Sequence, residues 1–134
     1  MILSREQMDS DVIAQIQEIS GEDVRACYQC GKCTAGCPLA STMDRMPNQI
    51  LRLLQVGEVE EALTSLTIWQ CASCLTCAAR CPKGVDPARV MDALRTLLAR
   101  QGVVRVEIPK IPADVLAEAP QQALIGGFRK YVGY

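Results

Sequence analysis

The stretch CYQCGKCTAGCP, from Cys27 to Pro38, is followed later in the chain by CASCLTCAARCP, from Cys71 to Pro82. We call these stretches the first motif and the second motif. Every cysteine of the first motif, and its closing proline, recurs in the second at an offset of 44 positions. Both read C-x-x-C-x-x-C-x-x-x-C-P, which is a ligand spacing of 4Fe-4S clusters. The repeat therefore predicts two such clusters in one chain.

The spacing also predicts which cysteines share a cluster. Three thiolates on one tight turn can each reach a different iron of a cubane, so the fourth must come from a distant segment. We therefore assign one cluster to Cys27, Cys30, Cys33 and Cys81, and the other to Cys71, Cys74, Cys77 and Cys37. Such crossed ligation would staple the two halves of the repeat together, so we expect the cluster-free protein to fold poorly.

Other uses of eight cysteines fit the pattern less well. All-cysteine zinc sites need only C-x-x-C pairs, which would leave the third cysteine and the C-x-x-x-C-P ending of each motif idle. The chain contains no histidine, which excludes mixed Cys/His zinc sites and His-based acid–base catalysis. A zinc-stabilised interaction module without redox activity stays an alternative, and acid-labile sulfide would separate it from an iron–sulfur protein.

Neither a leader peptide nor a membrane span is expected. The N-terminal stretch MILSREQMDSD lacks a basic segment followed by an apolar one, and no apolar run approaches the ~18 residues that a span needs. We therefore expect a cytoplasmic protein, whose compartment keeps thiols reduced and disfavours a disulfide framework. With 14 basic and 15 acidic residues the net charge is −1, which argues against a nucleic-acid-binding protein.

The fold is predicted to be mostly α. Hydrophobic residues make up 49% of the chain and aromatic residues only 4%, so we expect an aliphatic core. Amphipathic helical spacing marks four segments: 10–21, 47–57, 58–66 and 86–102. All but 58–66 also have proline or a capping residue at the start and glycine at the end. Ser10 and Asp86 are the predicted N-caps. Only residues 103–108 alternate in the manner of a strand.

The helical pattern also predicts which side chains are buried and which are exposed. In the first helix, Val12 should face inward with the isoleucines, and Leu66 should join the apolar face of the third. Arg89, Arg95 and Arg100 should point away from the apolar stripe of the last helix, towards solvent or a partner.

The chain is predicted to divide into three parts. Residues 1–22 form an N-terminal helix or arm, residues 23–102 a domain around two 4Fe-4S clusters, and residues 103–134 an extended C-terminal tail. The tail gathers Phe128, Tyr131 and Tyr134 in a chain otherwise poor in aromatic residues. We interpret it as a partner-docking arm that orders on binding, with a disordered terminus as the alternative.

Four side chains near the predicted ligands have alternative interpretations. Trp69 either shields a cluster or fills the core, and core filling is the commoner role. Lys32, Arg80 and Lys83 either raise a cluster's reduction potential and meet an acidic partner, or are ordinary solvated charges.

The motifs and the helices between them resemble a known class. The spacing of 34 residues from Cys37 to Cys71 is similar to that of α-helical ferredoxins. Within that class, the stretches ACYQCGKCTAGCP, MPNQILRLLQVG and WQCASCLTCAARCPKGVD resemble the C subunit of heterodisulfide reductase and its bacterial relatives. The resemblance covers roughly Val24 to Gly102, and it places all eight cysteines on the family's cluster ligands.

The resemblance implies a non-catalytic electron-transfer subunit of an oxidoreductase complex. In that family, the C subunit transfers electrons from a flavin-containing A subunit to a Cys-Cys-Gly B subunit, which reduces a disulfide. This chain has no adjacent cysteine pair and no G-x-G-x-x-G, so no catalytic residue is assigned to it. Alternatives are a freely diffusing two-cluster ferredoxin, which the near-neutral charge disfavours, and the iron–sulfur subunit of a fumarate reductase or glycolate oxidase type of complex.

Overall fold

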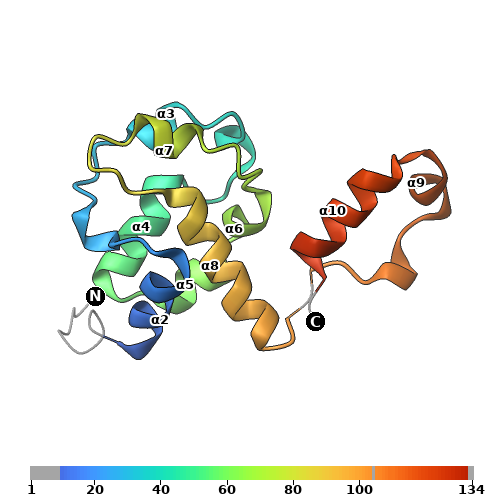
Figure 1. The fold of residues 1–134 in the computed structure, drawn as a ribbon, viewed down its shortest axis with the longest axis horizontal. Coiled ribbons are helices and arrows are strands. Elements are labelled where there is room, and N and C mark those ends of the chain that lie inside the picture. Colours follow the sequence, from blue (N-terminus) through green and yellow to red (C-terminus); the bar gives the residue numbers. More distant parts are fainter. Residues whose placement is uncertain (1–9, 104, 133–134) are drawn as a thin grey trace. The chain divides into compact units, whose positions relative to one another are not determined.

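The computed structural model describes residues 10–103 and 105–132, which are mostly helical and contain no strand (Figure 1). This confirms the predicted fold class. The elements in chain order are α2 (Asp11–Ser20), η1 (Val24–Ala26), α3 (Lys32–Ala35), η2 (Ala40–Thr42), α4 (Pro47–Val56), α5 (Val59–Thr64), α6 (Thr67–Gln70), α7 (Thr76–Arg80), α8 (Pro87–Arg100), η3 (Ile108–Lys110), α9 (Ala113–Glu118) and α10 (Gln121–Tyr131). They form two compact units, Met1–Leu94 and Arg95–Tyr134.

The first unit is built on an aliphatic core, as the composition predicts. Side chains from helices α2, α4, α6 and α8 are almost fully removed from water; the largest are Ile13, Ile16, Ile50, Leu51, Leu54, Ile68, Met91 and Leu94. Burying a side chain of this size stabilises a fold by roughly 1.5–3 kcal/mol. The longer helices therefore form a platform on which the two cysteine motifs lie.

The short helices of the two motifs, α3 and α7, pack against each other (Figure 1). Gly36, which ends α3, lies next to the Arg80 side chain of α7. A Cβ atom at residue 36 would lie 2.5 Å from Cδ of Arg80. A larger residue at position 36 would therefore force the Arg80 side chain to move.

Helix ends follow the sequence signals with one exception. The Asp86 carboxylate accepts hydrogen bonds from the backbone amides of Ala88 at 2.9 Å and Arg89 at 3.3 Å, which confirms it as the N-cap of α8. Ser10 precedes α2 as predicted, but its hydroxyl makes no capping bond. The Ser10 side chain was therefore wrongly predicted to cap this helix.

Three expectations about exposure are wrong. Val12 is 38% exposed because α2 buries the stripe of Ile13, Ile16 and Ser20, whose hydroxyl donates to the carbonyl of Ile16 at 2.7 Å. Leu66 is 41% exposed because α5 ends at residue 64.

The third wrong expectation concerns Arg95, which is only 6% exposed instead of facing away from the apolar stripe. It lies four positions after the buried Met91, and therefore on the same face of α8. A long aliphatic stem allows arginine to occupy such a position.

The second unit corrects the expectation of an extended tail. Residues 112 and 120 are prolines that directly precede α9 and α10, and proline suits a helix start because the first turn needs no amide donor. The backbone amides of Arg105 and Val106 donate to the carbonyl of Tyr131 at 2.8 and 3.0 Å, instead of forming a strand. Tyr134 and residues 1–9 of the predicted N-terminal arm lie outside the described residues.

Candidate iron–sulfur site

The first unit contains a pocket lined by four cysteines from both motifs, which we call the first pocket. Cys27, Cys30 and Cys33 come from the first motif, and Cys81 comes from the end of the second. The empty space is about 340 Å³, including that at its open mouth. The remaining lining residues are Tyr28, Gly31, Lys32, Asn48, Leu51, Lys83 and Pro87.

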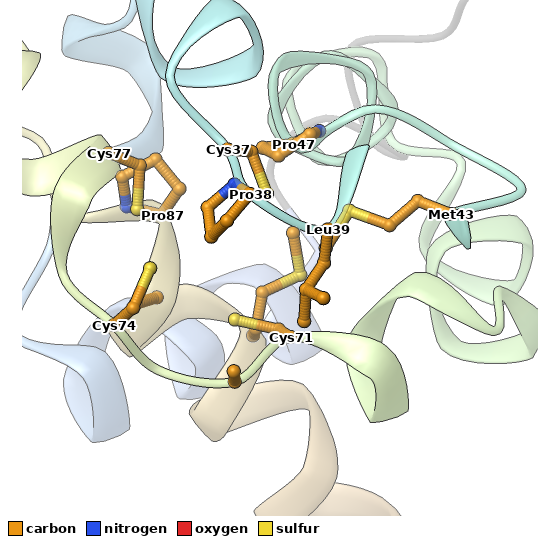
Figure 2. Close-up of a pocket in the computed structure, with 12 residues that line it drawn as sticks. Cys37, Pro38, Leu39, Met43, Pro47, Cys71, Cys74, Cys77 and Pro87 are labelled. Atoms are coloured by element: carbon orange, nitrogen blue, oxygen red, sulfur yellow. The ribbon is translucent and has the colours of Figure 1, made fainter. Parts of the chain in front are cut away.

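A second pocket mirrors this arrangement with the motifs exchanged. Figure 2 shows Cys71, Cys74 and Cys77 of the second motif around the space, together with Cys37 from the end of the first motif. The empty space is about 400 Å³. The remaining lining residues are Pro38, Leu39, Met43, Pro47, Ala72, Pro87, Ala88 and Met91. Pro87 lines both pockets, so the two share part of a wall.

The two motif loops have the same unusual backbone. Gln29 and Gly31 have φ of 63° and 76°, and the equivalent residues of the second motif, Ser73 and Leu75, have φ of 53° and 60°. Left-handed backbone on both sides of the second cysteine turns the chain sharply around the pocket. Because the same turn is made twice, the 44-residue repeat is a repeat of backbone conformation as well as of cysteine spacing.

Helix α4 holds the first motif in place. The side-chain amide of Gln55 donates to the carbonyls of Val24 at 2.9 Å and Cys27 at 2.6 Å. Two turns earlier along the same helix, Asn48 accepts from the hydroxyl of Thr34 at 2.5 Å. The two bonds of Gln55 satisfy loop carbonyls that no helix or sheet pairs, and the bond of Asn48 joins two side chains. The motif is thereby fixed at both its ends.

A carboxylate holds the segment that leads into the second motif. Asp44 accepts hydrogen bonds from the hydroxyls of Ser65 and Thr67, both at 2.8 Å, and from the backbone amides of Leu66 and Thr67 at 3.1 and 2.9 Å. Desolvation opposes the charge of Asp44, but these bonds outweigh it and lower the pKa to about 2. Sequence reasoning missed this contact, because nothing marks a lone aspartate as the partner of residues 21 to 23 positions away.

The thiol pKa values differ in the same way within each motif. A hydrogen bond from the backbone amide of Lys32, with one from Tyr28, lowers the pKa of Cys30, and a hydrogen bond with Thr76 lowers that of the equivalent Cys74. Burial raises the pKa of the next cysteine in each case, and that of Cys77 reaches about 11. Each pocket thus combines an outer thiol that ionises readily with an inner thiol that must lose its proton on binding metal.

The donor set fits a polynuclear cluster. All eight cysteines are free thiols. Among residues 10–103 and 105–132, no three side chains of Cys, Asp or Glu converge closely enough to bind a single metal ion. Four sulfurs spread around a cavity are instead what a cubane requires, because each thiolate binds a different iron. Besides its cysteines, the second pocket is lined by apolar residues alone, whereas the first also has polar and charged ones.

Not every residue that the sequence singles out reaches a pocket. Lys32 and Lys83 line the first pocket, whereas Trp69 and Arg80 line neither. Trp69 is half-buried. Sequence reasoning missed Tyr28, although its position between the first two cysteines was a usable signal. It also missed the more distant lining residues, which are Leu39, Met43, Asn48, Leu51 and Met91.

No helix within the described ranges is both long enough and apolar enough to cross a membrane.

Comparison with known proteins gives a consistent result. Residues 23–85 match the family model of the 4Fe-4S dicluster domain. The iron–sulfur C subunit of the CoB–CoM heterodisulfide reductase of Methanopyrus kandleri is 34% identical over 109 residues, which cover 75% of this chain and 57% of that protein. A corresponding C subunit from Methanocaldococcus jannaschii is 33% identical over 111 residues, covering 80% and 59%.

A third relative, from Archaeoglobus profundus, is named as a protein like the C subunit of heterodisulfide reductase. It is 34% identical over 96 residues, covering 71% of this chain and 51% of that protein. The chain therefore spans little more than half the length of these relatives. The domain match and the eight thiols agree on two 4Fe-4S clusters as the bound groups. Residues 23–85 are a 4Fe-4S dicluster domain, and the chain belongs to the family of heterodisulfide reductase C subunits.

Proposed function

We propose that this chain is the electron-transfer iron–sulfur subunit of a heterodisulfide reductase-like complex. The observation that carries the proposal is the use of its thiols: all eight cysteines line two pockets, and the two pockets share Pro87. No cysteine is left over to attack a disulfide. The chain's role is therefore conduction, and the disulfide chemistry belongs to a partner.

The ligand sets of this proposal are the crossed ones. Cys27, Cys30, Cys33 and Cys81 hold the cluster of the first pocket, and Cys71, Cys74, Cys77 and Cys37 hold that of the second. The lining of each pocket by three cysteines of one motif and one of the other supports this assignment. Bound clusters supply one-electron exchange over a wide range of potentials, from roughly −700 to +450 mV. The chain's own residues orient the thiolates and set the polarity around them.

The proposed partners are a flavin-containing A subunit on one side of the relay and a Cys-Cys-Gly B subunit on the other. The names of the relatives support this, since they describe iron–sulfur subunits of CoB–CoM heterodisulfide reductases. We propose a cytoplasmic location for the complex, because an iron–sulfur protein built on free thiols suits a reducing compartment.

The proposed division of the chain assigns residues 23–102 to the cluster domain and residues 1–22 to an N-terminal arm. Residues 103–134 are proposed to dock a partner. Exposed apolar side chains on η3, α9 and α10 support this role, and they are Ile108, Val115, Leu116 and Ile125. Such side chains are typical of interface centres.

Anaerobic purification from the native cell, followed by mass spectrometry of whatever stays bound, tests the proposed function. We expect a flavoprotein and a Cys-Cys-Gly protein to co-purify. Recovery of the chain alone, brown and monomeric, would instead support the freely diffusing ferredoxin. Recovery with a different dehydrogenase would support the fumarate reductase or glycolate oxidase alternative.

The docking role of residues 103–134 has its own test. Ile125→Asp places a charge on an apolar side chain that is 52% exposed, and we expect it to abolish co-purification with the partners without loss of iron. Gln122→Asp, at an exposed polar position of the same helix, is the control and should co-purify as the parent does. Equal recovery of partners with both variants would contradict the docking role.

A further inference from the structure

The two pockets differ chemically although their cysteines are equivalent. The first pocket has two cations and two polar side chains among its lining residues: Lys32, Lys83, Tyr28 and Asn48. Apart from its cysteines, the second pocket is lined only by proline, alanine, leucine and methionine, with no charged residue among them. The 44-residue repeat makes the contrast explicit, because Lys32 corresponds to Thr76 and Tyr28 to Ala72.

Both cations of the first pocket are placed by the cysteine motifs themselves. Lys32 is the first residue of α3, between Cys30 and Cys33. Lys83 follows Cys81 by two positions, and its ammonium lies over the Tyr28 ring at 6.0 Å from the ring centre. A cation–π contact of this kind holds an exposed ammonium in place more firmly than solvent does. The charge of Lys83 is therefore held beside the first pocket, and Lys32 adds a second positive charge to its lining.

Tyr28 adds a further polar contact to the same pocket. Its hydroxyl forms a hydrogen bond with the sulfur of Cys30, and the backbone amide of Lys32 bonds the same sulfur. Both groups donate to the sulfur. The surroundings of the first pocket thus stabilise negative charge on its sulfurs.

We propose that Lys32 and Lys83 make the cluster of the first pocket the higher-potential one of the pair. Reduction adds one electron, and therefore one negative charge, to the group that the cysteines hold. Nearby positive charge stabilises that added charge. Hydrogen bonds to sulfur occur in both pockets, since Cys74 bonds the hydroxyl of Thr76, so the difference between the pockets is the two lysines. The proposal rests on the crossed ligand sets of the proposed function and deepens it by giving the relay a direction.

The direction follows from the order of the two potentials. One electron lost at the second pocket and gained at the first moves downhill, with no bond made or broken and no proton required. The electron donor would then dock near the second pocket and the acceptor near the first. An acceptor with an acidic docking surface would also complement Lys32 and Lys83.

The test is a redox titration of the anaerobic full-length protein, followed by electron paramagnetic resonance, with iron and sulfide measured on every sample. In Lys32→Gln/Lys83→Gln we expect the higher of the two midpoint potentials to fall and the lower one to stay. Lys110→Gln removes the same charge from a lysine that lines neither pocket, and should move neither potential. Added salt should lower the higher potential of the parent protein, because both lysines are exposed.

A second pair of variants tests whether a cation added to the second pocket raises the lower potential. Thr76→Lys places a cation at the position of the second pocket that corresponds to Lys32, and should raise the lower potential relative to Thr76→Gln. Both substitutions remove the hydroxyl that bonds Cys74, so the comparison isolates the charge.

The possible results separate the two proposals. A fall in the lower potential, an equal fall in both, or no change in the double lysine variant would overturn the proposed order while leaving the cluster assignment intact. Iron and sulfide for fewer than two clusters in the parent protein would instead defeat the assignment on which the order rests.

Discussion

At the scale of single residues, the site depends on two left-handed backbone positions in each motif. Glycine adopts this conformation without steric cost, but other residues pay roughly 1–2 kcal/mol. The first motif has Gly31 at the second of these positions, whereas the second motif has Leu75 there, with φ of 60° and a side chain that is 53% exposed. The second motif therefore carries strain that the first avoids.

Leu75→Gly should relieve that strain. We expect stabilisation by about 0.5–1 kcal/mol, since the greater freedom of glycine in the unfolded chain offsets part of the gain. The midpoint of thermal unfolding, measured anaerobically, should rise by roughly 2–4 °C. The matched variant Gly31→Leu should lower it by a similar amount. A lower midpoint for Leu75→Gly would show that the leucine side chain stabilises the fold by contacts that outweigh the backbone strain.

Single cysteines test the crossed ligation. Cys81→Ser should damage the same cluster as Cys30→Ser, although the two positions belong to different motifs, because their side chains line one pocket. Likewise, Cys37→Ser should match Cys74→Ser. Electron paramagnetic resonance of the reduced protein, with iron analysis, compares the surviving signals. If Cys81→Ser instead reproduced the spectrum of Cys74→Ser, each motif would bind its own cluster.

At the scale of elements, side chains from segments without cysteines form hydrogen bonds to the segments that contain or flank the two motifs. Gln55 of α4 bonds the start of the first motif, and Glu22 accepts from the backbone amide of Asp86 at 2.9 Å, ahead of α8. The carboxylate of Asp44 accepts a hydrogen bond from the backbone amide of Thr67, in the turn that leads into α6 and the second motif. Polar side chains on and between the packed helices thus help to position the cysteine loops.

Asp44→Asn should weaken this connection. An amide cannot accept all four hydrogen bonds, so we expect a loss of about 1 kcal/mol at pH 7, a modest value because the carboxylate is partly exposed. The measurement is the midpoint of thermal unfolding. Glu60→Gln, an exposed acidic residue of neighbouring α5, is the control and should change the midpoint little.

The pKa of Asp44 gives the same prediction a pH dependence. Folding lowers this pKa from the ordinary 3.8 to about 2, so the ionised carboxylate stabilises the folded state fully above about pH 4. The contribution is lost as the pH falls towards 2. The difference in unfolding midpoint between Asp44→Asn and the parent should therefore narrow below about pH 4. A constant difference down to pH 2 would assign the effect to packing instead.

At the scale of the whole molecule, the two cysteine sets connect the halves of the first unit. Each pocket draws three cysteines from one motif and one from the other, and the motif helices α3 and α7 also pack together. Bound clusters would therefore act as two cross-links between segments about forty residues apart in sequence. The free energy of binding a group held in this way becomes free energy of folding.

Removal of the clusters should therefore unfold much of the first unit. After oxidation and chelation of iron, we expect the far-ultraviolet circular dichroism signal of helix to fall, and the remaining structure to melt at a lower temperature. Reconstitution with iron and sulfide should restore both readings. Retention of the full helical signal and an unchanged melting midpoint would show that the aliphatic core suffices without the clusters.

The sequence by itself determined the chemistry of this protein. Cysteine spacing is a local property, and a repeat of 44 residues was sufficient to predict two clusters and the cysteine sets that the pockets bring together. Amphipathic spacing predicted the helical class. Helix boundaries marked by Pro47, Asp86 and Gly57 were also readable, because caps act over a single turn. These features depend on residues close in the chain.

Only the tertiary structure decided what surrounds the cysteines. The burial of Arg95, the four bonds of Asp44 and the contrast between a cationic and an apolar pocket all depend on segments that meet in space. The helices of residues 113–131 were also missed, although Pro112 and Pro120 directly precede α9 and α10. The physical reason is the same for all of these features. The polarity and the local propensity of a side chain follow from the sequence, but its burial and the charges next to it arise only from packing.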